Sequence, residues 1–192
     1  RVGHKSMKRI RDPIYGYISL DDKVIKIVDN PFFQRLRYIK QNGLAYLVFP
    51  SATHTRFEHS LGAFHVASMM VEKVKGNIDK ELIKKVALLH DIGHMPFSHT
   101  FEQALEILKE MDKDKYNDLI KNIIGPRQAA KFHEHMGVYI IKNCMGLDDG
   151  TSIAEKMADI YINKQAKIEA SIVSSTLDAD RLDFLQRDSY YF

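Results

Sequence analysis

The chain has 192 residues, of which 45% are hydrophobic and 28% charged. This composition supports one sizeable core and predicts a single domain spanning residues 1–192. The apolar runs fall far short of the roughly 20 residues that cross a bilayer, and no charged-then-apolar leader opens the chain, so we do not expect a membrane protein. The single cysteine, Cys144, cannot form an intrachain disulfide, which agrees with a cytoplasmic location. The net charge of +3 is spread over Lys-rich segments, so nucleic acid is not an expected partner.

Sequence patterns predict an all-α bundle with one small β-hairpin. Residues 8–20 alternate in polarity around a proline and a glycine, which predicts the hairpin. Residues 46–50 form a short apolar run that we expect to be extended. The chain stops at Phe192, directly after the last predicted helix, so we expect it to be truncated on its C-terminal side. Apolar spacing and capping residues predict helices over residues 21–30, 31–42, 57–70, 80–92, 96–111, 115–124, 131–141, 151–162, 167–175 and 178–188.

One stretch, residues 86–102, concentrates residues that can carry chemistry. The apolar residues before it predict a helix directed into the core, so His90 and Asp91 arrive together at the buried end of that helix. An imidazole and a carboxylate side by side can both reach one divalent ion beside the helix. An ordinary hydrogen-bonded pair in the core is the alternative interpretation of the same dipeptide.

A second pair follows this dipeptide closely. Gly93 is expected to end the first helix and Pro96 to open the next one. His99 and Glu102 would then lie three residues apart on one helix face. A carboxylate in that position can orient an imidazole and raise its basicity.

Two further candidates lie far from this stretch in the sequence. His59 falls in the first turn of an upstream helix, where a histidine could equally be a packed or capping residue. Asp180 belongs to the acid-rich helix over residues 178–188, which could be a solvated face. Arg181 and Arg187 among its aspartates would equally suit a nucleotide site, and spacing alone leaves both interpretations open.

These residues together resemble the HD superfamily of metal-dependent phosphohydrolases. The pattern of that family is a histidine, a His-Asp pair and a distant aspartate, which here are His59, His90, Asp91 and Asp180. Each lies in a longer matching segment, namely residues 56–62, 90–99 and 178–183. Within the superfamily, residues 33–41 and 48–50 are most similar to the deoxynucleoside triphosphate triphosphohydrolases.

The resemblance implies a divalent metal cofactor and a catalytic group beside it. The ion could be Fe, Mn, Zn, Ni or Mg, because all of them accept imidazole and carboxylate ligands. The implied metal ligands are His59, His90, Asp91 and Asp180. The implied catalytic residues are His99, Glu102 and His133.

The same resemblance implies the reaction and the substrate contacts. A deoxynucleoside triphosphate (dNTP) would be hydrolysed at its α-phosphorus by an activated hydroxide, which releases the deoxynucleoside and inorganic triphosphate. His99 would protonate the departing 5′ oxygen. Phe184 stands where the family has a tyrosine, which removes a hydroxyl near the sugar. The implied phosphate contacts are Arg56 and Arg181, and the implied sugar contacts are Gln41, Phe184 and Asp188.

The resemblance further implies regulation through assembly. In the resembling deoxynucleoside triphosphate triphosphohydrolases a guanine nucleotide binds between subunits, so we expect a homo-oligomer, a dimer or tetramer, that GTP or dGTP activates. Asp29 can accept from the N1 and N2 edge of guanine while Arg37 donates to O6. Alternatively, Asp29 caps the following helix and Arg37 is solvated. The implied activator residues are Lys8, Asp29, Gln34 and Arg37.

Three other functions fit parts of the sequence. The first is another HD hydrolase, a nucleoside monophosphatase or a cyclic-dinucleotide phosphodiesterase. The sequence lacks the Gly-Tyr-Pro signature of the phosphodiesterases, and monophosphatases lack the stretch at residues 35–41. The second is a non-catalytic nucleotide sensor, against which the complete predicted ligand set counts. The third is a nucleic-acid-binding module or nuclease, but no basic stripe interleaved with aromatic residues occurs.

Overall fold

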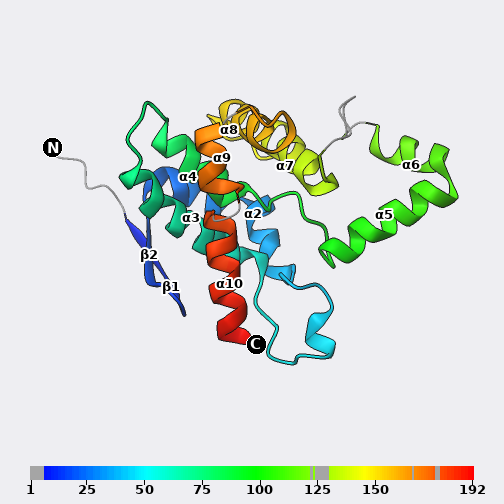
Figure 1. Ribbon diagram of the computed structural model, residues 1–192, viewed down its shortest axis with the longest axis horizontal. Helices are drawn as coiled ribbons and strands as arrows, with labels where there is room; N and C mark the ends of the chain where they lie inside the picture. Colours follow the sequence, from blue (N-terminus) through cyan, green and yellow to red (C-terminus); the bar gives the residue numbers. More distant parts are fainter. Residues whose placement is uncertain (1–6, 122, 124–129, 166, 176–177) are drawn as a thin grey trace.

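Helices make up most of the chain, with one two-stranded antiparallel sheet near the N-terminus, in agreement with the predicted fold class (Figure 1). The structure is a computed structural model that describes residues 7–121, 123, 130–165, 167–175 and 178–192. The elements are β1 (Lys8–Asp12), β2 (Gly16–Leu20), α1 (Asp22–Val28), α2 (Pro31–Gln34), η1 (Arg35–Tyr38), η2 (Ala45–Leu47), α3 (Arg56–Lys73), α4 (Lys80–Leu89), α5 (His99–Met111), α6 (Lys113–Ile120), α7 (Phe132–Asn143), α8 (Gly150–Met157), η3 (Ala158–Ile162), α9 (Lys167–Val173) and α10 (Ala179–Tyr191).

The predicted hairpin is present over residues 8–20, with Asp12 paired to Gly16 at its turn. The Asp12 carboxylate accepts from the backbone N–H groups of Ile14 and Tyr15, at 2.9 and 3.1 Å. Gly16 has φ +75°, a conformation that costs glycine little. Asp12 is thereby fixed in a buried position, from which it can also bind a side chain of the bundle.

Helix α3 is the centre of the bundle and packs against both α4 and α10. Its start is fixed by a capping box, in which Thr55 accepts from the backbone N–H of Glu58 and Glu58 accepts from that of Thr55. Buried residues occur on most sides of α3, as expected for a helix enclosed by others. Arg56 and His59 therefore project from the first turns of α3 into the interior.

The helix predicted over residues 31–42 is shorter than expected. It consists of the four-residue α2 and the 3₁₀ turn η1, and Ile39 then becomes extended. The reason is tertiary, because Lys40 forms a bridge with Thr55 and the Ile39 carbonyl accepts from the backbone N–H of Arg56 at 2.8 Å. Gln41 is held next to the start of α3 in the same way, since its N–H donates to the His54 carbonyl at 3.0 Å.

The run at residues 46–50 is not extended, contrary to the prediction. It folds into the 3₁₀ turn η2, in which the N–H groups of Val48 and Phe49 both donate to the carbonyl of Ala45. Leu47, Val48 and Phe49 are exposed, and among the described residues no strand pairs with this run to stabilise an extended form.

The boundaries around the His-Asp pair also differ from the prediction. Helix α4 ends at Leu89, three residues earlier than expected, and α5 begins at His99 instead of Pro96. Phe97 and Ser98 adopt positive φ values of 68° and 50°. Because a right-handed helix cannot include such residues, Pro96 lies in a turn and does not open α5.

The turn that carries His90 and Asp91 is fixed by contacts with Arg35 on one side and α7 on the other. Arg35 donates to the carbonyls of Ile92 and His94, at 2.6 and 2.8 Å. These two carbonyls therefore bind a side chain and do not continue the backbone hydrogen bonds of α4. A Cβ atom on Gly93 would lie 2.0 Å from the carbonyl oxygen of His133, so only glycine allows this turn to pass so close to α7.

Helices α5 and α6 extend away from the rest of the bundle (Figure 1). They pack against each other around a separate apolar cluster of Leu105, Tyr116 and Ile120. Helix α6 covers part of the helix predicted over residues 115–124, the end of which lies largely outside the described residues. The base of this arm is the first turn of α5, which contains His99 and Glu102.

The C-terminal helices agree with the prediction to within a few residues. The helix predicted over residues 151–162 is α8, continued by the π-helical turn η3. The acid-rich helix is α10, and Asp178 caps its start by accepting from the N–H of Arg181. This helix is not a simple solvated face, because Asp183 and Arg187 on it are fully buried. Among the described helices, none combines the length and apolar character that crossing a membrane requires.

Candidate metal and phosphate site

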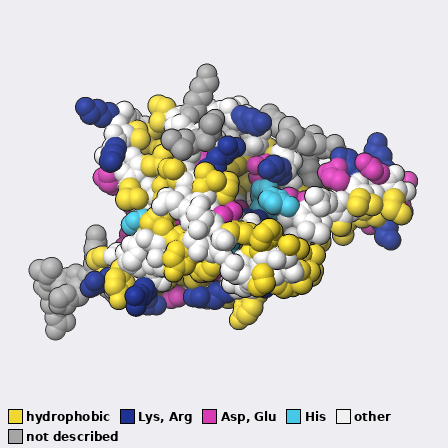
Figure 2. All heavy atoms as spheres, turned by 60° about the horizontal axis from the view of Figure 1, so that its bottom comes forward, with side chains coloured by type: hydrophobic (Ala, Val, Ile, Leu, Met, Phe, Trp, Pro, Cys, Tyr) yellow, Lys and Arg dark blue, Asp and Glu magenta, His cyan; other side chains and the backbone are white. Residues whose placement is uncertain are grey.

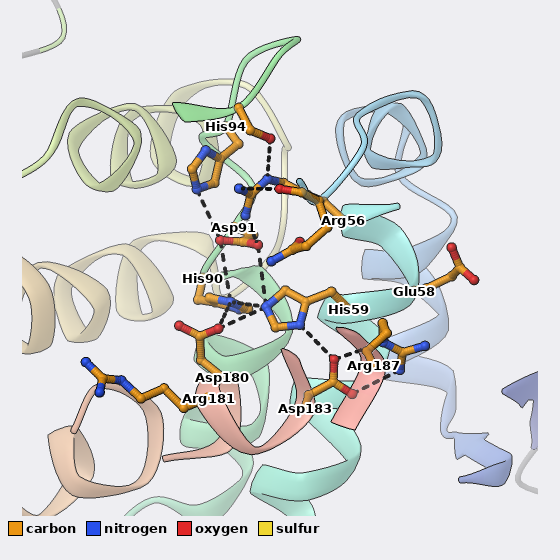
Figure 3. A network of polar contacts seen from close by, with 12 residues as sticks. Arg56, Glu58, His59, His90, Asp91, His94, Asp180, Arg181, Asp183 and Arg187 are labelled. Carbon is orange, nitrogen blue, oxygen red and sulfur yellow. Dashed lines mark hydrogen bonds and ion pairs between the residues drawn. The ribbon is translucent and has the colours of Figure 1, made fainter. Parts of the chain in front are cut away.

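His59 lies at the centre of the site and is fully buried. Its Nδ1 is 2.7 Å from Asp183 Oδ2, and its Nε2 is 3.0 Å from Asp180 Oδ1 and 3.2 Å from His90 Nε2 (Figure 3). A carboxylate that accepts the Nδ1 proton leaves the lone pair on Nε2. The Nε2 atom of His59 is therefore oriented as a ligand atom.

His90 presents its Nε2 to the same point from the end of α4. Its Nδ1 donates to the carbonyl of Ala87 at 2.8 Å, which again leaves Nε2 free to bind. The rings of His59 and His90 are 5.1 Å apart and steeply inclined, at 79°. One ion can consequently lie close to the plane of both rings, as coordination by imidazole requires.

The two predicted carboxylate ligands border this point. Asp180 Oδ1 is 3.6 Å from His90 Nε2, and Asp91 Oδ1 is 3.5 Å from the same atom. Ligand atoms of His59, His90 and Asp180 all lie within 4.8 Å of one another. His59, His90 and Asp180 thus converge on one point, and Asp91 lies next to His90. Their imidazole nitrogens and carboxylate oxygens fit a divalent metal ion. Metal binding itself stays a prediction.

The charges around the four residues favour a cation. Burial alone would lower the pKa of His59, but Asp180, Asp183 and Asp91 raise this pKa to about 10. Burial would likewise raise the pKa of Asp91, yet Arg56 and the nearby histidines hold it well below its usual value. The carboxylates therefore favour positive charge at the His59 ring, which a proton supplies without a metal and which a divalent ion could supply in its place.

Behind His59, a buried ion-pair network joins three elements. Asp183 accepts from Arg187 Nε at 3.0 Å and from its NH2 group at 2.9 Å, a bidentate pair within α10. The NH2 group of Arg187 is also 3.0 Å from Asp12 in the hairpin. Asp183 was not among the predicted site residues, although its spacing from Asp180 places it on the same helix face.

Arg56 connects the metal residues to the neighbouring pocket. Its guanidinium donates to Asp91, to the Ser98 hydroxyl at 2.9 Å and to the Gln41 carbonyl at 3.4 Å. Ser98 in turn donates to the carbonyl of Lys40 at 2.9 Å. These contacts hold the buried guanidinium beside the predicted metal ligands, where it can face a phosphate.

Glu102 binds both predicted catalytic histidines. Its carboxylate oxygens lie 2.9 Å from Nδ1 of His99 and 2.6 Å from Nδ1 of His133. Although burial opposes it, these two contacts lower the pKa of Glu102. The structure thus brings together His99, Glu102 and His133 from α5 and α7, with both Nε2 atoms unoccupied by Glu102.

His94, to which the sequence interpretation gave no role, completes this group. Its ring stacks on that of His133 with centroids 3.9 Å apart and planes inclined by only 20°. Burial lowers the pKa of His94 to about 3, so the ring is neutral. The ligand atoms of His94, His99 and His133 are close enough for a metal. However, two nearly parallel stacked rings cannot both contain one ion in their planes, so this group is a poorer metal site than the one at His59 and His90.

A pocket of about 340 Å³ is lined by the predicted metal ligands Asp91 and Asp180 and by His94, His99 and His133. Figure 2 shows histidine side chains reaching the surface with basic side chains beside them, and Figure 3 shows the guanidinium of Arg181 directed away from the two buried histidines. All five predicted substrate residues line this one pocket together with His99 and His133; they are Gln41, Arg56, Arg181, Phe184 and Asp188.

The predicted activator residues do not line this pocket. They form two surface pairs: Lys8 Nζ is 3.0 Å from Asp29 Oδ2, and Arg37 donates to Gln34 at 2.7 Å. Asp29 is not the side-chain cap of the next helix, because Asn30 accepts from the N–H of Phe32 instead. Arg37 is exposed and lies over the ring of Phe57.

Comparisons with known proteins identify the family of this chain. The HD domain family profile matches residues 56–185. An uncharacterized protein from Methanocaldococcus jannaschii is 45% identical over 185 residues, covering 96% of this chain and 34% of that protein. The deoxynucleoside triphosphate triphosphohydrolase SAMHD1 homolog from Dictyostelium discoideum is 32% identical over 195 residues, covering 97% and 37%. The crystal structure of a phosphohydrolase from Bacteroides thetaiotaomicron matches with a TM-score of 0.70 at 33% identity, covering 97% of this chain and 42% of that one.

This chain therefore spans only about a third to two fifths of the length of the curated relatives it matches. The family profile nevertheless covers more than half of the chain and includes His59, His90, Asp91 and Asp180. The chain belongs to the HD domain family of metal-dependent phosphohydrolases.

Proposed function

We propose that this protein hydrolyses deoxynucleoside triphosphates to deoxynucleosides and inorganic triphosphate. The observation that carries the proposal is the single pocket in which a cation-favouring centre, two arginines and the Glu102-bound histidine His99 meet. A substrate with several phosphates and one polar sugar fits that charge distribution. Relatives such as the Dictyostelium discoideum protein are named for this activity, which supports the same substrate class.

We propose that His59, His90, Asp91 and Asp180 hold a divalent ion at the floor of the pocket. When bound, such an ion supplies Lewis acidity and positive charge for phosphate oxygens. Fe, Mn, Zn, Ni and Mg all remain compatible with this donor set. Arg56 and Arg181 would contact the phosphates from the pocket wall, since a guanidinium matches phosphate oxygens geometrically.

His99 is the proposed general acid. Its side chain is 60% exposed, whereas that of His133 is 11% exposed, so His99 can reach a substrate in the pocket. Glu102 accepts the Nδ1 proton of His99 and leaves the Nε2 position to carry the proton that the departing 5′ oxygen needs. His133 shares the same carboxylate and would face the phosphates together with His94.

The sugar would lie against Gln41, Phe184 and Asp188. A carboxylate repels phosphates, so Asp188 is suited to accept from a sugar hydroxyl. On a 2′-deoxy sugar in a nucleotide, the 3′-hydroxyl is the hydroxyl that can donate. Phe184 provides an apolar wall to this part of the pocket.

We also propose activation by GTP or dGTP at Lys8, Asp29, Gln34 and Arg37, with assembly into a homo-oligomer. Lys8, Asp29 and Arg37 are exposed, whereas Gln34 is half-buried and donates to the Val28 carbonyl. The exposed residues support a site between subunits, because a ligand could replace the Lys8–Asp29 and Arg37–Gln34 pairings. Such a ligand would act by shifting the population towards the assembled, active form.

A substrate panel tests the proposed reaction. Purified protein with Mn²⁺ or Mg²⁺ is incubated with each dNTP, with nucleoside monophosphates, with cyclic dinucleotides and with single-stranded DNA. We expect deoxynucleoside and triphosphate from dNTPs only, and loss of both in Asp91→Ala. Orthophosphate from monophosphates, or cleavage of the cyclic dinucleotides or DNA without dNTP turnover, would replace the proposal by one of the other HD activities.

A further inference from the structure

Two side chains from a distant part of the chain hold the carboxylate of Asp188, one of the predicted sugar contacts. Its Oδ1 is 2.9 Å from His54 Nε2 and accepts from Asn42 Nδ2 at 3.0 Å. Both partners precede α3, whereas Asp188 lies near the end of α10. Among the described residues, no group donates to the second oxygen of Asp188, Oδ2. Asp188 also lines the pocket.

His54 is itself firmly positioned. Its side chain is fully buried, and its ring stacks on Tyr191 with centroids 4.7 Å apart. The hydroxyl of Tyr191 donates to Glu58 at 2.9 Å, and the carbonyl of His54 accepts from Gln41. These contacts fix the His54 ring, so its Nε2 atom holds a defined position next to the Asp188 carboxylate.

The protonation state of His54 agrees with this arrangement. Burial lowers the pKa of His54, although Asp188 opposes the shift, so the ring is neutral and carries a single N–H. Asp188 accepts that N–H, because the carboxylate lies at Nε2 while the buried Nδ1 has no partner among the described residues. Glu58 and Arg187 are the other charged groups close enough to influence the ring, and neither hydrogen-bonds it.

We infer that His54 and Asn42 are positioning residues that hold Asp188 with Oδ2 directed at the 3′-hydroxyl of the substrate sugar. Two donors on Oδ1 fix the carboxylate in advance, so the substrate does not have to order it on binding. The 3′-hydroxyl thereby becomes a requirement for efficient turnover. This inference rests on the proposed dNTP hydrolysis and adds two residues that act on the sugar only through Asp188.

The size of the effect follows from the kind of hydrogen bond involved. A hydrogen bond to a charged group commonly contributes a factor of about ten to one hundred in binding. We therefore expect the protein to prefer a dNTP over the 2′,3′-dideoxy analogue of the same base by about that factor in kcat/KM. Loss of either positioning residue should reduce this preference without abolishing turnover.

The test compares the two substrates in matched variants. Asn42→Ala and His54→Ala should raise KM for the dNTP and leave kcat/KM for the dideoxy analogue unchanged, so that the ratio falls about tenfold. His54→Gln, which keeps a donor near the Nε2 position, should restore most of the ratio. Asn77→Ala, an exposed asparagine in the loop between α3 and α4, is the matched control and should leave the ratio unchanged.

The possible outcomes distinguish the positioning inference from the proposed dNTP hydrolysis. A purely structural role would lower kcat/KM for both substrates equally and would overturn the positioning inference. A wild-type protein that hydrolyses both substrates equally well would overturn it as well, while leaving dNTP hydrolysis intact. Absence of any dNTP turnover would instead refute the proposed function. If His54→Ala does not fold, Asn42→Ala and His54→Gln still decide the question.

Discussion

Glu102 shows how one carboxylate can prepare two imidazoles. Each of its oxygens binds a different Nδ1 atom, and the backbone N–H of His133 donates to the same carboxylate at 3.1 Å. His99 and His133 are thereby held in one tautomer with their Nε2 atoms unused by Glu102. Only His99 is largely exposed, which supports the proposal that His99 is the proton donor and His133 a supporting ring.

His99→Ala should lower kcat for dNTP hydrolysis by about 10² to 10⁴ while the bound metal is retained, because a general acid typically contributes that much. Metal content by elemental analysis and turnover in the same preparation measure both effects. Asp91→Ala is the comparison and should lose metal and activity together. Wild-type turnover in His99→Ala would show that another group protonates the 5′ oxygen.

At the scale of elements, the contact between α3 and α10 sets the geometry of the site. Gly62 on α3 faces the Asp183–Arg187 pair so closely that a Cβ atom would lie 1.8 Å from Asp183 Oδ1 and 2.5 Å from Arg187. This approach lets Asp183 reach His59 from the neighbouring helix. Any separation of α3 and α10 would therefore also move a predicted metal ligand.

Gly62→Ala should destabilise the protein by about 1–3 kcal/mol, because the added methyl group overpacks a buried contact. It should also weaken metal retention, since Asp183 can then no longer orient His59 in the same way. Urea unfolding measures the first effect and elemental analysis the second. Gly76→Ala is the matched control, because a Cβ there meets nothing within 4 Å. Equal stability of the two variants would contradict the close packing of α3 and α10.

At the scale of the whole molecule, the predicted metal ligands come from α3, from the turn after α4 and from α10. An ion bound by all of them would cross-link segments that are remote in the sequence. Ligands that bind only the folded state stabilise it by mass action. The metal is therefore expected to contribute to folding as well as to catalysis.

Removal of the metal by a chelator should lower Tm by about 5–10 °C. The estimate combines about 2.7 kcal/mol for a ligand at one hundred times its Kd with about 2–4 °C per kcal/mol for a chain of this size. Differential scanning calorimetry before chelation, after it and after adding Mn²⁺ or Fe²⁺ measures the shift. His59→Ala serves as the control and should show no metal-dependent change. An unchanged Tm in the wild type would argue against a bridging ion.

Guanine nucleotide should raise the dATP hydrolysis rate of the wild type and increase its molecular mass in solution, because the nucleotide would favour the assembled form. Asp29→Ala should abolish both effects. Asp148→Ala is the matched control, since Asp148 is also an exposed carboxylate paired with a lysine, Lys26. Rates with and without GTP or dGTP, combined with light scattering, test the proposal. Equal activation of both variants, or of neither, excludes Asp29 from the site.

The sequence by itself determined the elements that depend on local patterns. The hairpin follows from alternation and turn residues, and α3 follows from apolar spacing and its capping box. The placement of His90 and Asp91 at a buried helix end was also predictable, because the residues before them are apolar at helical spacing. The family resemblance added Asp180 and His133, which no local pattern connects to the pair.

Only the tertiary structure decided the contacts between segments. The helix after Pro31 ends early because Lys40 pairs with Thr55. Residues 46–50 turn because Leu47, Val48 and Phe49 stay exposed and, within the described chain, no strand pairs with them. Asp183 behind His59 and His94 stacked on His133 depend on how α10 and α7 pack. Sequence periodicity reports which face of an element is buried, but not which element lies against that face. The partners of a buried charge are set by packing between segments that are far apart in the chain. Because the protein interior has a low dielectric constant, each of these contacts has a large effect on the energy of the buried charge.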